Sequence, residues 1–150
     1  MNKLLLLLVA ALVLAPAGAF AQAKKKDRPD TDIEKAMGQI AGAVRKLKNQ
    51  VTDPAQNATS LALVATIRAG ALEAKKHAPL RAADVPEGDR AAFVADFQKG
   101  MDEFLAAVAK LERALKDGKN DEAGRLFKEL GRLQKAGHKD FQRPEKQETR

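Results

Sequence analysis

Apolar residues recur at the three- and four-residue spacing of an amphipathic helix in four successive segments of this 150-residue chain. The segments predict helices at about residues 31–51, 59–77, 90–117 and 120–142. In the first helix the apolar positions are Ile33, Met37, Ile40, Val44, Leu47 and Val51. No segment alternates as a β-strand does, and no repeat recurs at a fixed period. The chain is therefore predicted to be all-α.

Residues that favour helix ends lie at the limits of these segments. Thr31 is followed three residues later by Glu34, which is the capping-box pattern of a helix start. Gly118 is expected to end the third helix, Asn120 to cap the fourth, and Pro144 to stop it. Long helices joined by short links pack as antiparallel neighbours. We therefore predict an up-down-up-down antiparallel four-helix bundle over residues 31–143.

The first 23 residues have the pattern of a secretory signal peptide. Lys3 precedes an unbroken apolar run at residues 4–14, and two Ala-x-Ala cleavage sites follow at residues 19–23. The alternative, a retained membrane anchor, requires a longer apolar run than this one. We expect a periplasmic protein with no membrane attachment after cleavage. Residues 24–30, which are mostly basic, and residues 144–150 are expected to be disordered tails.

The composition excludes several kinds of site. The chain has no Cys, which rules out disulfides, thiolate metal centres, thiol catalysis and covalent attachment of haem. Its formal net charge of +7 could indicate nucleic-acid binding, but export and the lack of aromatic residues among the charges argue against it. We expect instead a surface that stays soluble or attracts an acidic partner.

Two residues on the apolar faces could bind a metal inside the bundle. No Glu-x-x-His occurs on these faces, which excludes a di-iron carboxylate site. Met37 and His138 remain, about 9 Å and about 6 Å from the bundle end that the first and fourth helices share. A thioether and an imidazole form the axial ligand pair of some electron-transfer haems. Spacing alone leaves open that both are ordinary core or boundary residues. The other histidine, His77, is expected at the opposite end, on the surface and without a role.

Glycines inside the predicted helices are a second unusual feature. Each costs about 1 kcal/mol relative to Ala. Their number suggests that a bulky group approaches the backbone, although helix–helix contacts also use Gly. They are Gly38, Gly42, Gly70, Gly100, Gly131 and Gly137.

Around these positions the chain resembles the soluble cytochrome b562 family, which are periplasmic four-helix haem b proteins. The likeness covers about residues 32–141. It lies in Asp32-Ile33-Glu34 followed by Met37, in Arg68-Ala69-Gly70-Ala71-Leu72, in Asp96-Phe97 followed by Gly100, and in His138. The resemblance implies one non-covalent haem b with Met37 and His138 as axial ligands and Phe97 packed on the porphyrin. With both axial positions filled, it implies an electron carrier and not an enzyme.

The chain also departs from the family pattern near the implied haem. Met101 stands where the family has a second Phe, Gln134 and Gln142 where it has Arg, and Gly137 where it has Tyr. These departures bear on haem affinity and potential more than on haem binding itself. The alternative is a haem-free periplasmic bundle that acts as a protein-interaction or stress-binding module. For the haem protein we expect a monomer with redox partner proteins of acidic character and no nucleic-acid partner.

Overall fold

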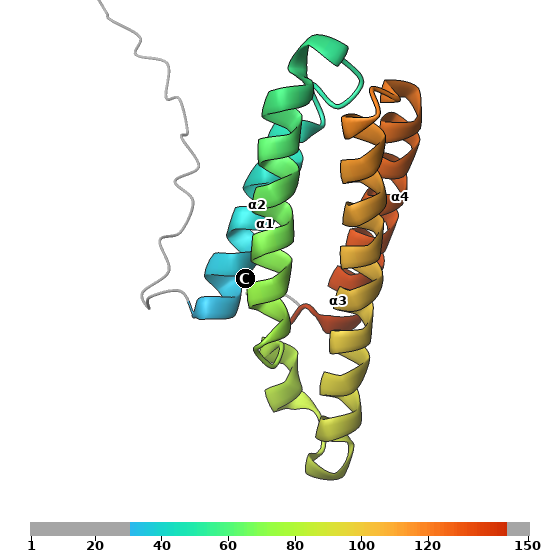
Figure 1. The fold of residues 1–150 in the computed structure, drawn as a ribbon. Helices are drawn as coiled ribbons and strands as arrows, with labels where there is room; N and C mark the ends of the chain where they lie inside the picture. The colour runs from blue at the N-terminus through green and yellow to red at the C-terminus, as the bar shows by residue number, and fades with distance from the viewer. Residues whose placement is uncertain (1–30, 144–150) are drawn as a thin grey trace, which may run out of the picture.

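The computed structural model describes residues 31–143. The predicted signal peptide and both predicted tails lie outside these residues. Within them the chain forms α1 (Asp32–Leu47), the 3-10 helix η1 (Pro54–Gln56), α2 (Asn57–Lys75), the 3-10 helix η2 (Leu80–Asp84), α3 (Glu87–Lys116) and α4 (Asn120–Phe141). Figure 1 shows α1 and α3 running one way and α2 and α4 the other. The predicted all-α, up-down-up-down four-helix architecture is confirmed.

Two of the predicted helix ends are confirmed in detail. At the start of α1 the Thr31 hydroxyl accepts a hydrogen bond from the Glu34 amide, and the Glu34 carboxylate accepts one from the Thr31 amide. After α3, Gly118 adopts a φ of 68°, which residues with a side chain rarely adopt. The amides of Gly118 and Lys119 then donate to the carbonyls of Leu115 and Ala114, closing the helix end.

The prediction that Asn120 caps α4 is wrong, because Asn120 is the first residue of that helix and Lys119 stands at the cap. The Asn120 side chain is 7% exposed and bonds elsewhere. Its Nδ2 donates to the Val51 carbonyl at 3.3 Å and to Asn57 Oδ1 at 2.7 Å. Asn57 Nδ2 donates in turn to the Leu115 carbonyl at 3.3 Å. This asparagine pair joins both connections at one end of the bundle, which we call the connection end.

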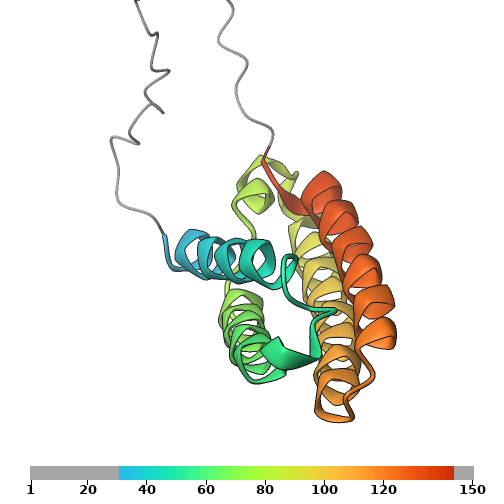
Figure 2. The same ribbon diagram turned by 90° about the horizontal axis from the view of Figure 1, so that it is seen from above.

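The core lies between three closely packed helix pairs, α1–α2, α2–α3 and α3–α4. Its fully buried large side chains are Leu47, Ile67, Leu111, Leu115, Leu130, Val64 and Val108. Viewed from above, α1 and α2 form one hairpin and α3 and α4 the other (Figure 2). The first and last helices are not among the closely packed pairs. The bundle is therefore held mainly along the chain order, from each helix to the next.

Gly70 lets the first hairpin pack closely. A Cβ at this position would lie 2.8 Å from Ile40 Cγ1 and 3.1 Å from the Ala36 carbonyl oxygen. The absence of a side chain therefore brings α2 against α1. Among residues 31–143, none of the helices combines the length and the apolar character that crossing a bilayer requires.

Candidate functional site

The chain topology brings the start of α1 and the end of α4 to the same end of the bundle (Figure 1). Met37 lies in the second turn of α1, and His138 lies in the last turn of α4. This end, which we call the open end, is opposite the connection end where Asn57 and Asn120 meet. The two residues with ligand chemistry are therefore on the first and last helices at one end.

The two side chains differ in burial. Met37 is half-buried and packs against the apolar core, whereas His138 is exposed. The apolar pattern of α4 predicted an interior position for His138, but this residue lies outside the core because α1 does not pack closely on α4 along this edge. Within residues 31–143 no side chain bonds the imidazole, and the backbone carbonyl of His138 accepts the Gln142 amide at 3.0 Å. Both ring nitrogens are therefore accessible to a ligand.

Space lies next to His138 on the inner side of α4. Gly137 is half-buried, yet a Cβ at this position would meet no atom within 4 Å. The position of Gly137, directly before His138, is therefore open and not packed against another helix. The prediction that a bulky group approaches the internal glycines is wrong for Gly70, which contacts α1 and serves helix packing. The open space at Gly137 is compatible with that prediction.

Phe97 belongs to an aromatic cluster at the open end. Its ring is 4% exposed and meets the Phe141 ring edge-on, with centroids 5.5 Å apart and an interplanar angle of 71°. Phe93 meets the other side of Phe141 at 5.3 Å. Met101, one turn further along α3, is 8% exposed. These side chains form an apolar wall between α3 and α4 on the turn that carries His138.

Two arginines that the sequence pattern does not single out hold the last turn of α4. Arg81 Nη1 donates to the carbonyls of Lys139 at 3.2 Å and Asp140 at 2.7 Å. Arg143 pairs with Asp84 through two bonds, at 2.7 Å and 3.0 Å. The η2 segment therefore positions the helix end next to His138. Both contacts join residues that are 58 to 63 positions apart in the sequence, so no local pattern could have pointed to them.

The prediction that His77 lies at the opposite end of the bundle from His138 is wrong. His77 lies three residues before the start of η2, whose Arg81 bonds the end of α4, so both histidines lie at the open end. The error came from counting helix directions, because α2 returns to the end where α1 began. His77 is half-buried, with Nε2 3.2 Å from Glu73 Oε1. A hydrogen bond from Lys76 lowers the pKa of Glu73, and a hydrogen bond with His77 lowers it to a smaller extent.

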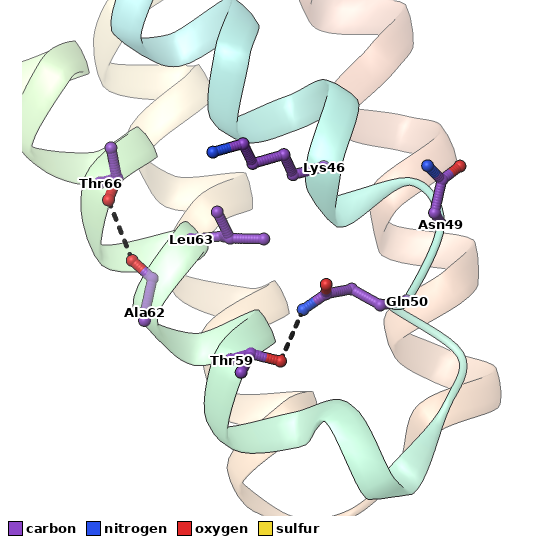
Figure 3. Close-up of a pocket in the computed structure, with 7 residues that line it drawn as sticks. All are labelled: Lys46, Asn49, Gln50, Thr59, Ala62, Leu63 and Thr66. Atoms are coloured by element: carbon purple, nitrogen blue, oxygen red, sulfur yellow. Dashed lines mark hydrogen bonds between the residues drawn. The ribbon is translucent and has the colours of Figure 1, made fainter.

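A separate hollow lies between α1 and α2 at the connection end, away from Met37 and His138 (Figure 3). It is lined by Lys46, Asn49, Gln50, Thr59, Ala62, Leu63 and Thr66. Gln50 Nε2 donates to Thr59 Oγ1 at 2.8 Å across it. Its single charged residue and its lack of an acid or a nucleophilic pair give it no catalytic chemistry. Within residues 31–143 no three side chains of His, Asp or Glu gather to hold a metal ion.

Comparison with known protein families identifies a match that covers most of the described residues. A protein-family model described as Cytochrome b562 matches residues 32–142, a segment that includes all four α-helices together with Met37, Phe97 and His138. A comparison with curated proteins gave no match.

Proposed function

Because this chain belongs to the cytochrome b562 family, we propose that it is a periplasmic electron-transfer protein that binds one non-covalent haem b through Met37 and His138. The family consists of small haem-binding electron carriers and not of enzymes. Family membership is shown. We propose in addition that Met37 and His138 are the haem ligands, that Phe97 packs on the haem and that the protein is periplasmic. The observation that carries it is the placement of a thioether and an unbonded imidazole at one end of a bundle that matches this family.

The donor set and its surroundings fit such a group. Methionine sulfur and histidine nitrogen together are an established axial pair, and among residues 31–143 neither the Met37 sulfur nor the His138 imidazole is hydrogen-bonded to another side chain. The room beside Gly137 lies next to the imidazole. A haem needs only axial ligands from the protein, so the absence of a gathered three-residue metal site within this range is compatible with it.

Each residue has a distinct part in the proposed function. When bound, the haem supplies a one-electron couple between ferrous and ferric iron. The Met37 thioether, a soft ligand, favours the ferrous form and raises the reduction potential. The aromatic cluster of Phe93, Phe97 and Phe141 keeps water from the buried side, which also tunes the potential. Met37 and His138 would together hold the haem iron, and the group would then serve for electron transfer and not for binding a substrate.

The proposed location depends on the signal peptide predicted at residues 1–23, which precede the described part of the chain. Removal of this segment would leave the bundle free in the periplasm. Mass spectrometry of protein recovered from a periplasmic extract should give a mature N-terminus after Ala21 or Ala23. An uncleaved chain that stays with the membrane fraction would contradict this location.

Absorption spectroscopy tests the ligands directly. Purified protein titrated with haemin and then reduced should give the sharp bands of low-spin ferrous haem. Met37→Ala and His138→Ala should each convert the spectrum to high spin, because each removes one axial ligand. His77→Ala is the matched control at the same end of the bundle and should leave the spectrum unchanged.

The outcomes separate the alternatives. Low-spin spectra that persist in both ligand variants would refute Met37 and His138 as ligands while leaving haem binding intact. Folded wild-type protein that takes up no haem would refute the electron-transfer function and favour the haem-free interaction module. Circular dichroism of each variant shows whether it is folded and keeps the two results distinct.

A further inference from the structure

A line of basic side chains runs along the outer face of α4. Its members are Arg125, Lys128, Arg132, Lys135 and Lys139, and all are exposed. They follow each other in steps of three and four residues, which places them within about 80° of the helix circumference and over about 21 Å of its length. We call this line the α4 basic stripe. Its centre lies opposite the core-facing side of the helix, which carries Ala123 and Leu130.

The stripe is not neutralised by acids of the bundle. Within residues 31–143, none of its five side chains makes an ion pair or a side-chain hydrogen bond. Several basic residues elsewhere in the bundle are paired with acids. The paired ones include Arg68 and Lys116, which both meet Glu112, and Lys75, which meets Asp102. The outer face of α4 therefore carries a continuous line of five positive charges that no acid of residues 31–143 pairs with.

The charges beside the stripe are unequal on its two edges. Glu122, Glu129 and Asp140 follow one edge, about 40° to 60° from Arg125. The opposite edge leads to His138, about 60° beyond Lys135. A further acid, Asp121, lies at the N-terminal end of the stripe. The pattern is thus a narrow positive band with an acidic border on one side and the proposed ligand on the other.

From this pattern we propose that the α4 basic stripe is the docking surface for a redox partner protein that presents an acidic patch. The redox role of the partner rests on the proposed function, whereas the binding of an acidic patch does not. A discrete acidic patch can cover the band and avoid the acidic border, which fixes its orientation. A uniformly anionic membrane surface would meet that border and be repelled by it. Among residues 31–143 the one exposed large apolar residue is Leu72 on α2, so α4 offers no anchor for lipid.

Docking on this face suits electron transfer. Lys135 and Lys139 lie within one turn of His138, so a partner bound along the stripe sits on the helix that carries the proposed ligand. The separation is then about the 10 Å width of one helix. Attraction between opposite charges speeds encounter without requiring tight binding, and the rate falls as salt is added. A carrier that must release its partner after each transfer benefits from such a contact.

Nuclear magnetic resonance tests the surface without any need for haem. The full chain, labelled with ¹⁵N, is titrated with a deca-glutamate peptide at low salt. Shift changes should concentrate at residues 125–139, and Arg132→Gln/Lys135→Gln/Lys139→Gln should weaken peptide binding about tenfold. Lys99→Gln/Lys110→Gln/Arg113→Gln is the matched control, because it removes the same charge from exposed, unpaired residues of α3. The control should retain most of the affinity.

Three results would overturn the docking surface. Shift changes spread over all four helices would mean that only net charge matters. An equal loss of peptide affinity in the stripe variant and the α3 control variant would also mean that only net charge matters. Stripe-dependent binding to vesicles containing phosphatidylglycerol, with no binding of the peptide, would identify a membrane site instead.

A kinetic measurement tests the redox role separately in the haem-loaded protein. Stopped-flow oxidation of the ferrous form by ferricyanide, an anion, should slow several-fold in the stripe variant, with a smaller change in the α3 control. Oxidation by the cationic tris(phenanthroline)cobalt(III) should become faster in the same variant. Peptide binding at the stripe combined with unchanged rates for both oxidants would refute its role in electron transfer. If no haem binds, the proposed function fails, while the peptide titration still decides the docking surface.

Discussion

Truncation of the asparagine pair at the connection end should destabilise the bundle strongly. Asn120→Ala removes a donor to the Val51 carbonyl and both amide–amide contacts with Asn57, at 2.7 Å and 3.3 Å. Asn120 is 7% exposed, so water replaces these partners poorly. The variant therefore leaves the Val51 carbonyl and the Asn57 side-chain oxygen without the donor that Asn120 supplies.

The size of the effect follows from the number of bonds. A protein hydrogen bond contributes about 1 kcal/mol net, and an orphaned buried group costs about 1–3 kcal/mol. The three lost bonds predict a decrease of about 3 kcal/mol in the free energy of unfolding. With a urea m-value of about 1.5 kcal/mol per M, the unfolding midpoint should fall by about 2 M. Because the pair shares two bonds, Asn57→Ala and Asn120→Ala should be non-additive by about 1–2 kcal/mol.

Urea unfolding followed by circular dichroism at 222 nm measures this double-mutant cycle in four proteins. The haem spectrum should not change in any of them, since the pair lies at the end away from Met37 and His138. A loss below about 0.5 kcal/mol for Asn120→Ala would refute the reasoning, because it would mean that the pair is solvated in solution. Strict additivity of the two truncations would also refute it.

Three further predictions concern the helix pairs and their ends. Gly70→Ala should lower the free energy of unfolding in urea by about 1–2 kcal/mol, since the new Cβ would press on a core isoleucine and a backbone carbonyl of α1. Gly131→Ala, which has open space around it, should instead raise the free energy of unfolding by up to about 1 kcal/mol. Asp84→Asn should lower the free energy of unfolding by less than about 1 kcal/mol, because its ion pair with Arg143 is exposed. Hydrogen exchange should nevertheless show faster opening of the last turn of α4, and unchanged exchange would mean that this ion pair does not hold the helix end. The pKa of Glu112 is lowered chiefly by a hydrogen bond from the lysine one turn later, so this carboxylate stabilises the fold above its unfolded pKa and loses that effect as pH falls through its folded pKa. Glu112→Gln should therefore cost about 0.5 kcal/mol at pH 7 and nothing at pH about 2, and an equal cost at both values would contradict this account.

Local patterns in the sequence predicted the fold because they act over one or two helical turns. The Thr31–Glu34 capping box and the Gly118 helix end depend on neighbouring backbone groups alone, and both are confirmed. Asn120 was misassigned because its side chain can cap a helix or bond across the fold. Its partners Val51 and Asn57 are far away in sequence, and no local rule selects between these uses.

The candidate site was predictable in its residue types and only partly in its geometry. Helix order alone puts Met37 and His138 at one end, and the same reasoning, applied carefully, would have put His77 there too. The exposure of His138 depends on how closely the first and last helices pack, which is a property of the whole bundle. The Arg81 and Arg143 contacts with the end of α4 depend on the path of η2, and no periodic signal describes a short 3-10 segment.

The arrangement of helix contacts bears on the order in which this protein is assembled. Since three consecutive helix pairs already enclose the apolar interior, the polypeptide should reach its native topology before it meets its prosthetic group. Loading is then a binding step that follows folding, and it adds to stability by mass action as the free concentration exceeds the dissociation constant. On the proposed function, the chain without haem should therefore already be a folded, colourless helical bundle.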